Sequence, residues 1–97
     1  METEFSYTLI NLDDDLEDCT TFYAPRENLK IPEIVKEAYK KSDMTINPNT
    51  PYRVIIQRVG LDGLEEELYD NFFFETDDTG NECYILKRGD KQTIYNK

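Results

Sequence analysis

The chain has 97 residues, with 21 Asp and Glu against 11 Lys and Arg, so its net charge is −10. This length corresponds to one domain and leaves little room for a deep catalytic cleft beside a hydrophobic core. Hydrophobic residues make up 38% of the chain, including seven Tyr and five Phe, which argues against global disorder.

The first predicted elements are two strands separated by an acidic loop. Residues 5–12 alternate apolar and polar side chains, which predicts a strand. Residues 13–18 are almost all Asp and Glu, which repel one another and favour a loop. Residues 19–24 are β-branched and aromatic, and they predict a returning strand.

A helix over 32–42 follows the break at Pro25. Apolar residues recur there at helical spacing, namely Ile31, Ile34, Val35, Ala38 and Tyr39. Pro32 suits the first helical position, and Lys40 and Lys41 suit the last turn, where they meet the negative end of the helix dipole.

The second half of the chain predicts a loop, a strand, a short helix and a hairpin. Residues 47–51 are turn residues, and residues 52–59 predict a strand buried on both faces. A short acidic helix is predicted over 64–70, because Leu64 and Leu68 lie one helical turn apart.

The last elements are strands 72–76 and 83–87, joined by a turn around Gly80, then a second turn at 88–91 and a final strand 92–95. The order ββαβαβββ predicts one α+β domain spanning 1–97. Its antiparallel sheet of four to six strands carries one main helix and the short acidic helix. The expected core comprises Ile34, Val35, Ala38, Val54, Ile56, Phe73, Ile85 and Ile94.

The usual signatures of catalysis are missing from the sequence. Histidine is absent, which removes Ser-His-Asp and Cys-His catalysis. The four glycines form no phosphate-binding loop, and Cys19 and Cys83 are too far apart for a zinc motif. The loop 13–18 does not fit the calcium-loop template, although weak cation binding stays open. We therefore predict that the protein is not an enzyme and has no cofactor and no bound metal.

The first four residues are acidic where a signal peptide is basic, and no apolar run reaches the length of a membrane span. We expect a cytoplasmic protein that does not bind a membrane. In that compartment both cysteines are expected to be reduced.

Acidic residues are concentrated in two segments that contain no base. Residues 1–25 hold seven acids and residues 62–82 hold nine. A purely solvated surface gains from interspersed bases, so their omission favours a surface for a cationic partner. The net charge opposes direct binding of nucleic acid. The predicted partner-binding residues are Asp14, Asp15, Glu17, Glu66, Glu67, Asp70, Asp77 and Asp78, with Tyr69 as an aromatic anchor.

In size, charge, the acidic segments 13–18, 65–70 and 75–82, the lack of histidine and the small α+β plan, the chain resembles a class of phage and mobile-element inhibitors. This class includes anti-CRISPR and anti-restriction proteins that mimic DNA. The resemblance implies an inhibitor that binds the basic nucleic-acid-binding groove of a host defence nuclease, in the host cytoplasm. Two alternatives remain open: an immunity protein that neutralises a toxin nuclease, and a non-enzymatic adaptor whose acids form a solvated face.

Overall fold

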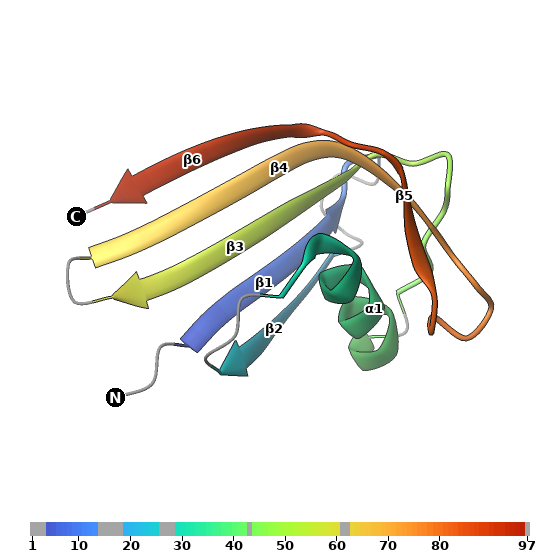
Figure 1. Cartoon of the computed structure of the whole chain (residues 1–97), viewed down its shortest axis with the longest axis horizontal. Helices are drawn as coiled ribbons and strands as arrows, with labels where there is room; N and C mark the ends of the chain where they lie inside the picture. The colour runs from blue at the N-terminus through green and yellow to red at the C-terminus, as the bar shows by residue number, and fades with distance from the viewer. Residues whose placement is uncertain (1–3, 14–18, 26–28, 43, 61–62, 97) are drawn as a thin grey trace.

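In the computed structural model, the described residues form one antiparallel sheet of six strands with a single helix on one face (Figure 1). The structure describes residues 4–13, 19–25, 29–42, 44–60 and 63–96. The elements are β1 (Glu4–Asn11), β2 (Cys19–Pro25), α1 (Ile31–Ser42), β3 (Tyr52–Gly60), β4 (Gly63–Thr76), β5 (Cys83–Lys87) and β6 (Asp90–Asn96). The order ββαββββ confirms the predicted α+β class.

The strands lie in the order β2-β1-β3-β4-β5, and β6 also pairs with β4. The 14-residue β4 is long enough to pair with β5 through its last residues and with β6 through its first ones. Because β5 and β6 are both antiparallel to β4, the chain keeps its direction through residues 88–89 (Figure 1). The prediction of a second turn at 88–91 is therefore wrong, because residues 88–89 interrupt the strand without reversing the chain.

The predicted helix over 64–70 is wrong, because these residues form the first half of β4. Spacing of four residues places two side chains on one face of a helix and also on one face of a strand, so Leu64 and Leu68 could not distinguish the two. Pairing with β3 on one side and β6 on the other satisfies the backbone of this segment. The part of the chain that the structure describes contains no second helix.

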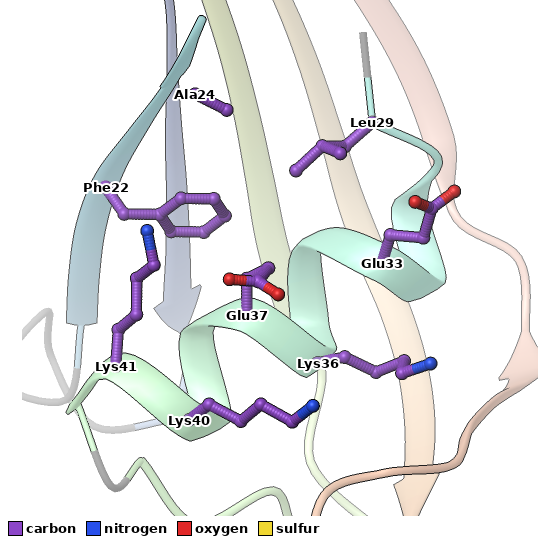
Figure 2. A pocket seen from close by; sticks show the side chains of 8 residues that line it. All are labelled: Phe22, Ala24, Leu29, Glu33, Lys36, Glu37, Lys40 and Lys41. Atoms are coloured by element: carbon purple, nitrogen blue, oxygen red, sulfur yellow. The ribbon is translucent and has the colours of Figure 1, made fainter. Parts of the chain in front are cut away.

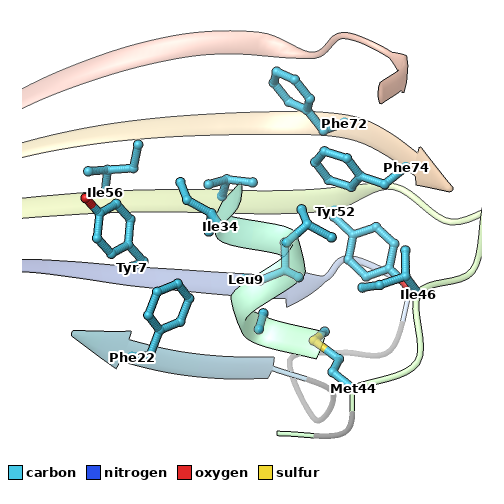
Figure 3. Close-up of a cluster of buried hydrophobic side chains, with 13 residues drawn as sticks. Tyr7, Leu9, Phe22, Ile34, Met44, Ile46, Tyr52, Ile56, Phe72 and Phe74 are labelled. Carbon is cyan, nitrogen blue, oxygen red and sulfur yellow. The ribbon is translucent and has the colours of Figure 1, made fainter. Parts of the chain in front are cut away.

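The hydrophobic core lies between α1 and the face of the sheet that α1 covers, called here the helix face (Figure 3). Its members are Tyr7, Leu9, Phe22, Ile34, Val35, Ala38, Met44, Ile46, Tyr52, Val54, Ile56, Phe72 and Phe74. This confirms five of the predicted core residues, and Ile85 packs partly buried against them. The side chain of Ile94 lies outside the described residues.

The core prediction for Phe73 is wrong because β4 contains a β-bulge. Asn71 has a φ of 61°, in the left-handed region that Asn tolerates better than most residues. The register with β3 shifts by one residue there, so Phe72 and Phe74 face the helix. Phe73 is consequently half-buried on the opposite face of the sheet, called here the outer face.

The outer face is not covered by α1. Along β1 and β3, residues on the outer face alternate with the core residues of the helix face. Thr8 and Ile55 are two residues of the outer face, and both are half-buried instead of buried. Thr8 and Thr21 share a hydrogen bond of 3.0 Å between their hydroxyl oxygens on this face. The expectation that β3 is buried on both faces is therefore met on the helix face alone. No described helix is long and apolar enough to cross a membrane.

Candidate functional site

The predicted partner-binding residues fall into three groups in the structure. Asp14, Asp15 and Glu17 lie outside the described residues. Four others, Glu66, Glu67, Tyr69 and Asp70, lie on β4, which is paired on both of its sides. Asp77 and Asp78 lie in the exposed turn that joins β4 to β5.

Two of the β4 acids form ion pairs with neighbouring strands. Arg53 on β3 donates to both carboxylate oxygens of Asp70, from Nε at 2.6 Å and from Nη2 at 3.1 Å. Lys91 on β6 places Nζ 3.1 Å from Oε1 of Glu67. These bases come from segments distant in sequence, so the lack of bases within 62–82 did not reveal them. The charges of Asp70 and Glu67 are therefore balanced within the sheet.

Glu66 and Tyr69 are also engaged inside the molecule. Gln57 Nε2 on β3 donates to Oε2 of Glu66 at 2.7 Å. The Tyr69 ring packs edge-on against Phe72, with ring centroids 5.7 Å apart, and is partly buried against the core. Tyr69 is therefore chiefly a packing residue on the helix face.

A further group of acids lies in a segment called here the acidic arm, residues 75–86, which spans the end of β4, the turn and most of β5. Its four exposed acids are Glu75, Asp77, Asp78 and Glu82, and the segment contains no Lys or Arg. Glu75 and Glu82 were not among the predicted contacts, although both lie in the acidic segment 62–82. The hairpin brings these acids together by reversing the chain around Gly80.

Asp77 shapes the turn. Its Oδ1 accepts hydrogen bonds from the Thr79 backbone at 3.1 Å, the Thr79 hydroxyl at 2.9 Å and the Asn81 backbone at 3.0 Å. Desolvation is the largest single influence on Asp77 and raises its pKa, but these bonds and one from the Glu82 backbone together outweigh it and lower the pKa below its usual value. Gly80 supplies the positive φ of 72° that the turn needs. Asp77 is thus ionised and structural, while Asp78 and Glu82 point their charges outward from an ordered turn.

The helix holds the tip of the acidic arm in place. The Tyr39 hydroxyl of α1 donates a hydrogen bond of 2.9 Å to the backbone carbonyl of Asp78. The Tyr39 ring also lies directly against Gly80. The carboxylates of the arm are therefore presented from a supported hairpin.

Two large apolar side chains are exposed on the same arm. Tyr84 is 58% exposed and Leu86 is 51% exposed, and both belong to β5. The register places Tyr84 directly opposite Glu75 on β4. An aromatic side chain beside carboxylates is typical of a protein-binding surface, where aromatic residues carry much of the affinity. The alternation of half-buried and exposed positions along β5 is the pattern from which the sequence could have indicated an exposed Tyr84.

Both cysteines are free thiols in different surroundings. Burial raises the pKa of Cys83 to about 11, with the positive charge of Lys36 opposing this in part, whereas Cys19 is exposed. We predict that iodoacetamide at mildly alkaline pH alkylates Cys19 quickly and Cys83 slowly, because only the thiolate reacts. Mass spectrometry of the two peptides over time measures this, and equal rates in the folded protein would contradict it.

The raised pKa of Cys83 also predicts a pH effect on stability. The unfolded chain ionises this thiol near its ordinary pKa, whereas the folded chain keeps it protonated up to about 11. Stability from this group is present below the unfolded pKa and is lost as the pH rises through that interval.

Among the residues with described positions, no three Cys, Asp or Glu side chains are grouped so that they could hold a metal ion. Comparisons with protein-family models, curated proteins and solved structures found no match to this chain. The functional proposal accordingly rests on the acidic arm and on the charge of the chain.

Proposed function

We propose that the protein is an acidic inhibitor that binds the basic nucleic-acid-binding groove of a host defence nuclease and keeps DNA out of it. The observation that carries this proposal is the acidic arm. Four exposed acids lie within residues 75–86, a segment without Lys or Arg, next to the exposed side chains of Tyr84 and Leu86.

The chemistry of such an arm suits a groove built for phosphates. Carboxylates held at fixed positions on a hairpin can accept the hydrogen bonds and ion pairs that Lys and Arg otherwise give to a nucleic-acid backbone. The net charge of −10 attracts the protein to a cationic groove over a distance and accelerates association. Tyr84 and Leu86 supply apolar contact area that a phosphate backbone lacks, which slows dissociation.

The paired acids of β4 contribute less to this function. Asp70 and Glu67 are already held by Arg53 and Lys91, so recruiting them to a partner would first break these contacts. The contact surface is therefore smaller than the acidic segment 62–82, and it is centred on the turn that contains Asp78.

The test is a charge-neutralising triple variant of the arm, Glu75→Gln, Asp78→Asn and Glu82→Gln. Asp77 is left unchanged because it shapes the turn. The matched control removes the same charge elsewhere, with Glu33→Gln, Glu37→Gln and Asp90→Asn. Binding and DNA cleavage are measured with a panel of guide-loaded CRISPR nucleases and restriction enzymes at low and high salt, and circular dichroism checks folding.

Wild-type protein is expected to inhibit at least one nuclease of the panel. The arm variant should bind that nuclease more weakly by about tenfold or more, chiefly through slower association at low salt, and the control should retain most of the affinity. Inhibition of no nuclease, or equal binding by the two variants, would reject the acidic arm as a nucleic-acid mimic. Binding to another protein without salt dependence would favour the adaptor alternative.

A further inference from the structure

β2 is an edge strand of the described sheet, and its own residues carry little of the usual protection against pairing. It stands at the end of the strand order and pairs with β1 through seven consecutive residues without a bulge. No charged residue lies within Cys19–Pro25, although a third of the chain is charged, and the single proline comes at its end. Natural proteins block exposed edges with charges, prolines and bulges, so an edge without them is suited to accepting another strand.

The opposite edge of the sheet is built differently. It is divided between β5 and β6 by the break at 88–89, and a register shift interrupts the pairing of β5. The charged residues Lys87, Asp90 and Lys91 lie along it. The contrast between the two edges locates the strand-accepting side of the described sheet at β2.

A groove runs beside β2 on the helix face (Figure 2). It has a volume of about 260 Å³, with Phe22, Ala24 and Leu29 as its apolar lining and charged side chains of α1 as its rim. Lys41 places Nζ 5.1 Å from the centre of the Phe22 ring. A strand added to β2 would direct every second side chain toward this groove, because side chains alternate between the faces of a sheet.

We propose that β2 pairs antiparallel with β2 of a second copy of this chain, so that two sheets join around a two-fold axis. The strand is complementary to itself in this arrangement. With Phe22 opposite its own copy, the pairs are Thr21 with Tyr23 and Thr20 with Ala24, all uncharged. Pairs of aromatic and β-branched residues stabilise neighbouring strands.

The distribution of charge permits this dimer despite the net charge of −10. The groove beside β2 is lined by two acids and three lysines, Glu33, Glu37, Lys36, Lys40 and Lys41. The acidic arm belongs to β4 and β5, at the other end of the strand order. Joining two copies through β2 therefore places the two acidic arms at the two far ends of the joined sheet. This inference is independent of the proposed function.

The experiment measures the oligomeric state by sedimentation equilibrium over a range of protein concentrations, together with hydrogen exchange of the backbone amides. The test variant is Tyr23→Lys, which places a charge on the β2 edge. The matched control is Tyr84→Lys on β5, since the two tyrosines are 61% and 58% exposed. Both replace an exposed side chain, and circular dichroism checks that each variant folds.

We expect a concentration-dependent dimer in which amides of residues 19–25 exchange more slowly as the dimer forms. Tyr23→Lys should raise its dissociation constant about tenfold or more, while Tyr84→Lys should leave it close to wild type. A monomer at every concentration, a dimer unaffected by Tyr23→Lys, or protection located outside β2 would overturn the proposal. Protection of β2 that appears only when a different protein is added would also overturn it.

Discussion

Replacing Gly89 with Ala should destabilise the protein by roughly 3 kcal/mol, the upper end of the usual cost of overpacking. A Cβ at this position would overlap the backbone carbonyl oxygen of Asp70 and lie 2.7 Å from its carbonyl carbon. It would also lie 2.8 Å from the carbonyl carbon of Asn71. These are backbone atoms of the β4 bulge, so no side-chain rotation relieves the overlap.

The effect of Gly89→Ala is measured by urea denaturation followed by circular dichroism. Arg88→Ala is the control, because it changes the neighbouring exposed side chain and should alter stability by about 0.5 kcal/mol or less. For a domain of this size the expected loss is a large fraction of the total stability. If the two variants were equally stable, the close approach of Gly89 to the bulge would be refuted.

Phe74→Ala should cost about 3–5 kcal/mol, the usual range for removing a fully buried phenylalanine. Phe74 has no exposed surface, stacks on Phe72 with ring centroids 5.7 Å apart and lies 6.1 Å from the ring of Tyr52. Removing its ring would leave a cavity between the rings of Phe72 and Tyr52 (Figure 3).

Phe73→Ala is the matched control for the bulge. Phe73 lies half-buried on the outer face, with Lys87 Nζ 5.7 Å from its ring, so its removal should cost about 1 kcal/mol. Thermal and urea denaturation of both variants give the comparison. A larger loss for Phe73→Ala than for Phe74→Ala would restore the core assignment made from sequence and contradict the bulge at Asn71.

Those elements whose signals are local were predictable from the sequence. The helix 32–42 was correct within one residue, because apolar spacing, Pro32 at the start and lysines in the last turn all act within the helix. Strands 5–12 and 19–24 and the turn at Gly80 were correct for the same reason, since alternation and turn residues are properties of short segments.

Features that depend on neighbours distant in the chain were decided by the tertiary structure. Residues 64–70 are compatible with a helix by their spacing, and they form a strand because β3 and β6 pair with both of their edges. The bulge at Asn71 then decides which phenylalanines face the core, and a shift of one residue exchanges the two faces of a strand.

The candidate site divides in the same way. The sequence by itself determined the charge of −10, the absence of bases from 62–82 and the exposure of the turn that contains Asp77 and Asp78. Only the tertiary structure separated these acids from those of β4, because it brought Arg53 and Lys91 from other strands into contact with Asp70 and Glu67. A carboxylate on a strand that is paired on both sides lies beside the side chains of two neighbouring strands and can form an ion pair with a base on either of them. A carboxylate in a hairpin turn has solvent beside it, so its charge stays available to a partner.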